Sequence, residues 1–155
     1  MTITRRDFNK AGLGALSLAA LGSQAWAGPE HMIQKAIPST GEKVPIIGLG
    51  TNRYGVGDDT EKRALLRAAL GRFHKLGGTV IDTAPMYRSS EAVLGDLIAD
   101  LDIRDDLFIA TKVDKDGGGA ATHAQIEESM RRLQTDKFEL LQVHNLIAWQ
   151  DALPV

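Results

Sequence analysis

The sequence lacks cysteine altogether, and aromatic residues make up only 5% of its 155 positions. Without cysteine, neither a disulfide bond nor a thiolate metal site can form. The four histidines show no HxH or HExxH spacing, so we expect no bound metal ion. An excess of either charge is also lacking. The net charge is −2 and the basic residues are scattered apart from Arg5-Arg6 and Arg131-Arg132, which argues against a nucleic-acid partner.

The apolar run near the N-terminus, from Ala11 to Gly22, is shorter than the ~20 residues that a bilayer requires, so we expect no stable membrane span after processing. Twin arginines in "TRRDFNK" precede this run, and "AWA" follows it with the small residues that signal peptidase requires. This order is typical of a twin-arginine export signal. It predicts a leader over residues 1–27, a mature domain over residues 28–155, the export machinery as a partner and a periplasmic location. The alternative is an amphipathic N-terminal helix with a chance arginine pair.

Short apolar segments and amphipathic segments alternate through the rest of the chain, which is 43% hydrophobic and 25% charged. This composition is sufficient for one globular core. The alternation predicts strands separated by helices, and a parallel sheet covered by helices follows from it. The predicted strands lie in the segments "VPIIGLGT", "TVID", "LFIATK" and "FELLQVHN".

Capping patterns mark the ends of the predicted helices. Asp58 with Glu61 predicts the start of the first helix, and Gly77-Gly78 predicts its end. The second helix is predicted to begin after Ser89 or Ser90 and to bury the apolar positions between Val93 and Leu101. A third helix is predicted to begin at a capping box formed by Thr122 and Gln125.

Both a doubly wound sheet and a barrel fit this alternation, and the strand ends distinguish them. Gly50, Asp82, Lys112 and His144 lie at the ends of successive predicted strands, at intervals of 32, 30 and 32 residues. Such regularity favours a repeating β/α unit that closes into a parallel (β/α)8 TIM barrel, with chemistry at the carboxyl ends of the strands. A doubly wound nucleotide fold would need GxGxxG, whereas "GLG" is followed here by "TNR".

The residues at these strand ends predict a site for proton transfer. A tyrosine ordinarily has a pKa near 10, and a neighbouring ammonium lowers that pKa because it stabilises the phenolate. Tyr87 follows Asp82 on the next loop, and Lys112 is predicted to supply the ammonium. Asp82 would hold Lys112 in place and keep it charged, and His144 would orient a carbonyl oxygen beside Tyr87.

At these residues the sequence resembles the aldo-keto reductase family, from about Gly41 to Asn145. The resemblance is carried by "GEKVPIIGLGT", "VIDTAPMYRSSEAVLG", "LFIATKV" and "LLQVHN". It implies NADPH- or NADH-dependent reduction of a small-molecule carbonyl compound on a (β/α)8 barrel. The implied catalytic residues are Tyr87 as proton donor with Asp82, Lys112 and His144. The implied cofactor-binding residues are Gly50, Thr51, Asn52, Asp82 and Asn145.

The predicted strands account for only the first four β/α units, whereas an eight-stranded barrel takes about 250 residues. The resemblance implies that the basic residues for the cofactor phosphates lie in the other half, so we expect this half-barrel to be inactive alone and to associate through its open sheet edges. Two alternatives remain: a reductase-like binding or accessory subunit without catalysis, and a barrel aldolase that uses Lys112 as a Schiff-base amine.

Overall fold

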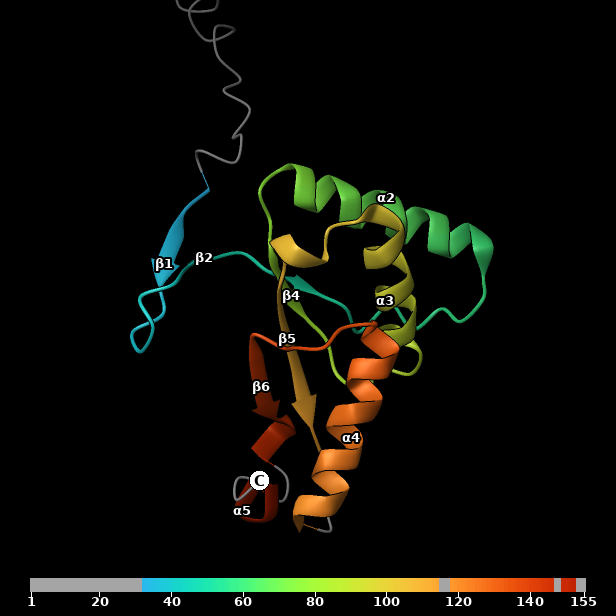
Figure 1. The fold of residues 1–155 in the computed structure, drawn as a ribbon. Coiled ribbons are helices and arrows are strands. Elements are labelled where there is room, and N and C mark those ends of the chain that lie inside the picture. The colour runs from blue at the N-terminus through green and yellow to red at the C-terminus, as the bar shows by residue number, and fades with distance from the viewer. Residues whose placement is uncertain (1–31, 115–117, 147–148, 153–155) are drawn as a thin grey trace, which may run out of the picture.

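The computed structural model describes residues 32–114, 118–146 and 149–152, so the predicted leader over residues 1–27 lies outside the described residues. The described chain begins with a hairpin and continues as an alternation of strands and helices (Figure 1). The elements are β1 (Gln34–Ala36), β2 (Lys43–Pro45), β3 (Leu49–Gly50), α2 (Thr60–Lys75), β4 (Val80–Asp82), α3 (Ser90–Leu101), η2 (Arg104–Asp106), β5 (Phe108–Val113), α4 (Gly118–Leu133), β6 (Leu140–Val143), η3 (His144–Leu146) and α5 (Trp149–Ala152).

Four of the strands form one sheet in the order β3-β4-β5-β6, and every neighbouring pair is parallel. Spatial order therefore follows chain order, with a helix between β3 and β4, between β4 and β5, and between β5 and β6. A doubly wound sheet would reverse its strand order at a switch point, and none occurs among these four strands. The sheet has the topology of four consecutive units of a (β/α)8 barrel, which confirms the predicted fold class.

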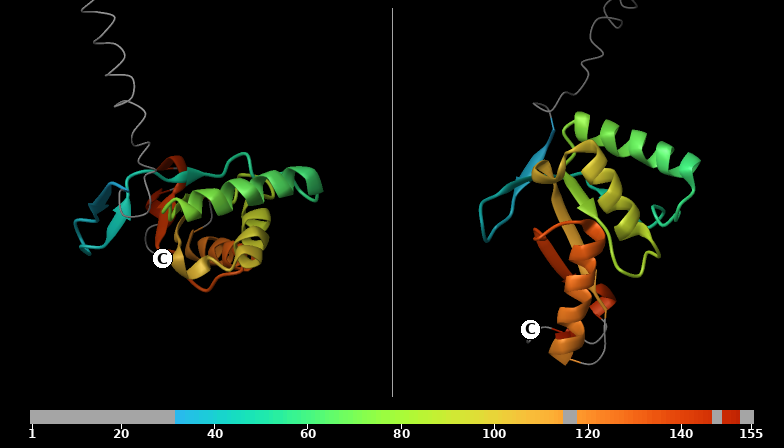
Figure 2. Two further views of the ribbon diagram at one scale, coloured as in Figure 1. Left: turned by 90° about the horizontal axis from the view of Figure 1, so that it is seen from above. Right: turned by 45° about the vertical axis from the view of Figure 1, so that its right-hand side comes forward.

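The long helices α2, α3 and α4 lie on one side of the sheet. Figures 1 and 2 show α2, α3 and α4 together on one side of β4 and β5, with the β1–β2 hairpin on the other side. The hairpin strands pair antiparallel, with Lys35 opposite Val44. Within the described residues, β3 and β6 form the two open edges of the sheet. None of the helices in these ranges is long and apolar enough to cross a membrane.

The core fills the space between the sheet and the helices. Ile81 in β4 and Ile109 in β5 are fully buried, and they form the part of this core that comes from the central strands. Each fully buried aliphatic side chain stabilises the fold by roughly 1.5–3 kcal/mol. The predicted apolar positions of α3 are confirmed, and the helix side of the core consists of Leu70, Val93, Leu94, Leu97, Ile98 and Leu133.

The close packing of α3 on α4 depends on Gly95. A Cβ atom at this position would collide with the backbone of Arg132 and Leu133, because the two helices approach closely there. Glycine is the residue that allows such an approach. Contacts of this kind hold α4 against α3 and thereby hold the strand that leads into α4.

The structure corrects two of the predicted helix starts. The N-cap of α2 is Asp59, whose carboxylate accepts a hydrogen bond from the Lys62 amide at 3.0 Å, and the predicted Asp58 lies one residue too early. Helix α4 begins at Gly118, so Thr122 and Gln125 lie inside it and do not form a capping box. Gln125 instead bonds the backbone and side chain of Asp114, because the chain leaving β5 folds back onto the helix.

The other predicted helix ends agree with the structure. Helix α3 begins at Ser90, as predicted. Helix α2 ends at Lys75, and Gly77 follows with φ 89°, the left-handed conformation expected after a helix C-terminus.

Candidate active site

An ion pair joins the carboxyl ends of β4 and β5. Lys112 Nζ lies 2.8 Å from Asp82 Oδ1 and 2.7 Å from Oδ2, and it also donates to the Thr83 carbonyl oxygen at 2.7 Å. The register of the two strands brings Asp82 opposite Ala110, two residues before the lysine. The Lys112 side chain is only 11% exposed, whereas that of Asp82 is 42% exposed. The carboxylate therefore compensates a nearly buried positive charge.

These three acceptors use all three N–H donors of the ammonium. A Schiff-base lysine must become a neutral amine with a free lone pair before it attacks a carbonyl carbon. In this structure Lys112 Nζ instead directs its donors at the Asp82 carboxylate and the Thr83 carbonyl oxygen. The geometry thus favours the predicted electrostatic role over the aldolase alternative.

Two rings lie beside this ion pair. Lys112 Nζ is 5.4 Å from the centroid of the Tyr87 ring, and the rings of Tyr87 and His144 meet edge to face with centroids 5.9 Å apart. Tyr87 comes from the loop after β4, and His144 directly follows β6. The structure thereby brings together all four residues predicted to form the proton-transfer site. The arrangement can place a phenol and an imidazole beside one carbonyl oxygen, with the ammonium next to the phenol.

The His144 ring has one nitrogen without a partner. Its Nδ1 atom is buried and has no hydrogen-bond partner among the described residues. A buried polar atom without a partner carries a free-energy cost, and such atoms occur at functional sites. The described residues therefore leave one polar atom of this imidazole unsatisfied beside the Tyr87 ring.

The predicted cofactor residues divide into exposed and buried ones. Gly50 is exposed, and a Cβ atom on it would meet nothing within 4 Å, so the space beside this strand end is open. Asn52 and Asn145 are also exposed. Asn145 adopts a left-handed backbone conformation with φ 53°, which asparagine tolerates better than most residues.

Thr51 differs from the other predicted cofactor residues. Its side chain is fully buried, its hydroxyl donates to the Asp82 carbonyl oxygen at 3.0 Å, and it lies 3.2 Å from the Ser90 hydroxyl. These bonds tie the end of β3 to the end of β4 and to the start of α3. The Thr51 side chain therefore holds the loops behind the site, and a contact between Thr51 and a cofactor stays a prediction.

Sequence reasoning missed a buried carboxylate behind the site. Glu91 is 1% exposed and accepts hydrogen bonds from Thr111 Oγ1 at 2.9 Å and from Ser129 Oγ at 3.2 Å, with Arg132 at 3.6 Å. Burial raises the pKa of the Glu91 carboxyl above its usual value, although these partners act in the opposite direction. The available signal was helical spacing, since Glu91 shares a helix face with Leu94 and Ile98.

A cavity of about 610 Å³ lies on the helix side, between Pro85-Met86 and helix α4. Its lining includes Asp114 and Arg132 but none of the four residues gathered around the ion pair. We place the candidate site at the strand ends and not at this cavity, because the four residues predicted to transfer a proton gather at the strand ends.

Known proteins match this chain over the segments that contain the four site residues. The family model described as "Aldo/keto reductase family" matches residues 46–154. The aldo-keto reductase YhdN of Bacillus subtilis is 36% identical over 134 residues, which cover 76% of this chain and 38% of the relative. The methylglyoxal reductase YeaE of Escherichia coli is 37% identical over 117 residues, which cover 73% of this chain and 40% of the relative.

Solved structures of aldo-keto reductases are also similar to this chain. An aldo-keto reductase from Klebsiella pneumoniae in complex with NADPH is 37% identical with a TM-score of 0.62, and the match covers 79% of this chain and 44% of that one. The holo form of an aldo-keto reductase from Bacillus halodurans is 25% identical with a TM-score of 0.63, covering 80% and 45%. The chain thus spans about two fifths of the length of the two curated relatives described above.

Proposed function

Since the chain belongs to the aldo/keto reductase family, we propose that its strand ends form the acid–base half of a site that reduces an aldehyde or ketone to an alcohol with NADPH or NADH. The observation that carries this proposal is the convergence of Lys112, Tyr87 and His144 at the ends of β4, β5 and β6. A carbonyl oxygen that gains negative charge during reduction needs a proton donor and a nearby positive charge. The three side chains meet both needs.

In this proposal Tyr87 donates its hydroxyl proton to the carbonyl oxygen. Lys112 stabilises the negative charge that the phenol oxygen acquires, and Asp82 holds Lys112 in position at 2.7 Å. His144 orients the carbonyl oxygen toward the phenol. When bound, the nicotinamide supplies the hydride that reduces the carbonyl carbon.

The described residues fit a nicotinamide at this edge of the sheet. The open space beside Gly50, the exposed amides of Asn52 and Asn145 and the backbone of Thr51 are the groups we propose for contact with it. The Klebsiella pneumoniae neighbour was solved with NADPH, which supports NADPH over NADH as the cofactor. The name of the Escherichia coli relative, methylglyoxal reductase, supports small reactive carbonyl compounds as the substrate class.

The test requires a complete barrel. We suggest continuing this chain with the part of the Bacillus subtilis relative that lies beyond the match, and we refer to the product as the completed barrel. In it Tyr87→Phe is expected to lower kcat for aldehyde reduction by at least ~100-fold with little change in cofactor binding, since only proton donation is lost.

The matched control is Tyr54→Phe. Tyr54 is the other tyrosine of the two in the sequence, and its buried hydroxyl has no hydrogen-bond partner among the described residues. Its removal should leave kcat near the wild-type value. Normal turnover of Tyr87→Phe would contradict the proposed mechanism.

We also propose that residues 1–27 direct export by the twin-arginine route to the periplasm, with residues 28–155 as the mature domain. The support is the order of "TRRDFNK", the apolar run and "AWA" in the sequence. Replacing Arg5 and Arg6 by lysine should retain the precursor in the cytoplasm, whereas the wild type should be found outside it with Gly28 as its first residue. The exported protein would be examined by N-terminal sequencing. A sequence that begins at Met1 would refute this proposal.

The 155-residue chain by itself is expected to lack cofactor affinity and activity. It spans only about two fifths of the two curated relatives, and the binding energy of a dinucleotide comes largely from contacts to its phosphates and adenosine. Its exposed edge residues Leu140 and Leu141 are expected to favour association of copies. Fluorescence titration with NADPH and size-exclusion chromatography test this. A monomer that binds NADPH at micromolar concentration and reduces an aldehyde would contradict it.

A further inference from the structure

The loop that carries Tyr87 is in close contact with the loop between β3 and α2. Gly55, in the loop between β3 and α2, lies against the backbone of Tyr87. A Cβ atom on Gly55 would lie 2.6 Å from the Tyr87 carbonyl oxygen and 3.0 Å from the Cβ atom of Arg88. Ordinary van der Waals contacts of a Cβ atom begin at 3.4 Å. Any side chain at position 55 must therefore displace the backbone of Tyr87.

Two hydrogen bonds hold the loops together on either side of this contact. The Gly57 amide donates to Ser89 Oγ at 3.0 Å, and Ser90 Oγ donates to the Thr51 carbonyl oxygen at 2.7 Å. Because both bonds connect the same two loops, the loops cannot separate at Gly55 without stretching at least one of them. A displacement caused at Gly55 is therefore directed into the Tyr87 segment.

The Tyr87 backbone has little freedom to absorb such a displacement. Its amide donates to the Ala84 carbonyl oxygen at 3.1 Å, and its own carbonyl oxygen accepts from the Ser90 amide at 3.0 Å. Arg88, the next residue, has φ 58°, a left-handed conformation that a residue with a side chain adopts only where its surroundings impose it. The carbonyl group that faces Gly55 thus belongs to a constrained turn, which moves as a unit with the phenol ring.

We propose that Gly55 is a positioning residue, whose missing side chain sets the place of the Tyr87 phenol relative to Lys112 and His144. This inference rests on the proposed function, in which Tyr87 donates the proton. Relieving the contact needs a shift of several tenths of an ångström up to about 1 Å, and a misplacement of about 1 Å can lower a catalytic rate by about 100-fold. Gly55 acts through Tyr87 and does not touch the reacting atoms.

The first test needs neither cofactor nor substrate and uses the 155-residue chain. The edge-to-face contact of the Tyr87 and His144 rings, with centroids 5.9 Å apart, should give a nuclear Overhauser effect between their ring protons. Gly55→Ala is expected to weaken or abolish this signal. A signal of wild-type intensity in a folded Gly55→Ala variant would overturn the inference.

Gly57→Ala is the matched control in the same loop. Gly57 has φ 59°, so alanine strains the backbone, but its Cβ atom would meet nothing within 4 Å. This variant should show a lower melting temperature and an unchanged signal between the two rings. Loss of the signal in both variants would mean that general damage to the loop, and not the contact with Tyr87, is responsible.

The second test is kinetic and uses the completed barrel. Gly55→Ala is expected to lower kcat at least ~10-fold while the cofactor Kd stays at its wild-type value, because only the acid is misplaced. Tyr87→Phe is measured alongside. Wild-type turnover of Tyr87→Phe would refute the proposed function, whereas slow Tyr87→Phe with wild-type kcat for Gly55→Ala would refute the positioning role alone.

If Gly55→Ala does not fold, Ser89→Ala takes its place. This change removes the acceptor of the Gly57 amide without adding atoms, and it loosens the same contact between the loops. It should weaken the signal between the rings and lower kcat, both by less than Gly55→Ala would. Wild-type values of both quantities in Ser89→Ala would overturn the inference.

Discussion

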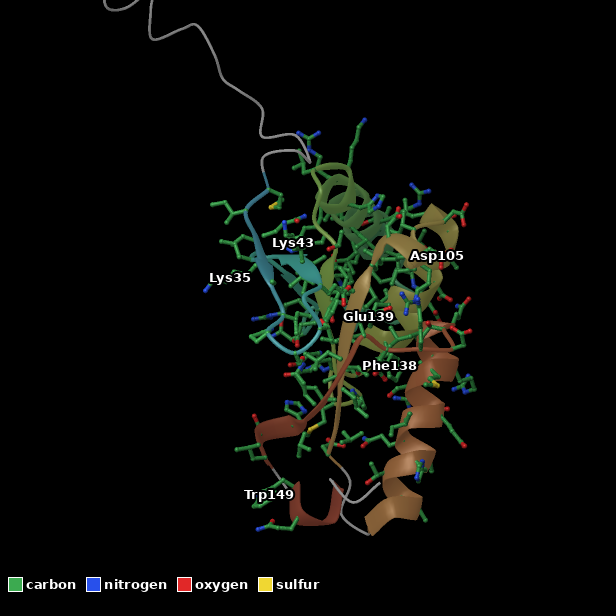
Figure 3. The ribbon with its side chains drawn as sticks, turned by 60° about the vertical axis from the view of Figure 1, so that its left-hand side comes forward. Lys35, Lys43, Asp105, Phe138, Glu139 and Trp149 are labelled. Carbon is green, nitrogen blue, oxygen red and sulfur yellow. The ribbon has the colours of Figure 1, made fainter. Side chains whose placement is uncertain are left out.

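The two ends of β5 each carry an ion pair, and the two pairs differ in what surrounds them. At the amino end the Arg104 guanidinium contacts Glu139, and both side chains are less than one fifth exposed, at 19% and 17%. At the carboxyl end Lys112 contacts Asp82, of which 42% is exposed. Figure 3 shows Glu139 beside Phe138, where the chain enters β6.

At the amino end, other groups of the protein supply further hydrogen bonds to both members of the ion pair. Arg104 donates to Thr135 Oγ1 at 2.7 Å and to the Lys137 carbonyl oxygen at 2.8 Å, and it also contacts the Leu107 carbonyl oxygen. The Glu139 carboxylate accepts the Ile109 amide at 2.7 Å. Apart from the Leu107 contact, these bonds join residues in and just before β5 to the segment that leads into β6. This end of the sheet is built for stability.

The carboxyl-end pair lies beside the rings of Tyr87 and His144. The Tyr87 ring lies 5.4 Å from the Lys112 ammonium, and His144 Nδ1 has no partner among the described residues. In barrels of this kind, conserved function belongs to the carboxyl ends of the strands and stability to the amino ends. Substitutions in the two pairs should therefore separate activity from stability.

The largest effect is expected from Lys112→Met in the completed barrel. Loss of the ammonium removes the charge that assists proton donation by Tyr87, so kcat should fall by roughly 1,000-fold, within the range of acid–base catalysis. The melting temperature should change little, because Asp82 is exposed enough to remain solvated without its partner. Steady-state kinetics and thermal unfolding of the same preparation check both statements.

Arg104→Met should give the opposite pattern with a smaller effect. Removing the guanidinium leaves the Glu139 carboxylate mostly buried, with the Ile109 amide at 2.7 Å and, as its nearest remaining cation among the described residues, Lys137 at 3.7 Å. The free energy of unfolding should fall by roughly 2–3 kcal/mol, somewhat less than for a fully buried pair. Urea denaturation measures this change, and kcat at a temperature where the protein is folded should stay near the wild-type value. A large loss of kcat would remove the distinction between the two ends.

The smallest effect is expected from Glu91→Gln, and it depends on pH. Burial raises the pKa of Glu91 in the folded state above the usual value of 4.5, so the folded state binds the proton more tightly than the unfolded state. The wild type therefore loses stability as the pH rises from that usual value through the raised pKa. Glutamine does not titrate, so the stability of Glu91→Gln relative to the wild type should increase across this window.

Urea denaturation of both proteins from about pH 4 to pH 7 tests this prediction. The difference in the free energy of unfolding should grow with pH and then level off. A difference that shrinks over this window would show that Thr111, Ser129 and Arg132 stabilise the carboxylate by more than burial costs it.

The strands and the residues at their ends could be predicted because they depend on local patterns. An apolar segment followed by Asp82 or by His144 marks a strand end, and parallel strands place such ends along one edge of the sheet. Helix starts were less predictable. Asp58 and Asp59 both suit an N-cap, and in the structure Asp59 is the residue that caps the helix.

The supporting residues could not be predicted because they depend on contacts between distant segments. Gly55 looks like an ordinary loop glycine until the Tyr87 carbonyl is found against it. Glu91 looks like a favourable acidic residue in the first turn of α3, and its burial depends on α4, which lies about 30 residues later along the chain. The family resemblance implies that Thr51 binds the cofactor, but it does not show that the Thr51 hydroxyl bonds Asp82 and Ser90.

A double-mutant cycle in the completed barrel tests most directly whether the strand-end residues act as one proton-transfer unit. Single-turnover rates of aldehyde reduction would be measured for the wild type, Tyr87→Phe, Lys112→Met and the double variant. If Lys112 acts through Tyr87, the double variant should be about as slow as the slower single variant, because residues that act as a unit are not additive. Single-variant effects that multiply in the double variant would contradict the account.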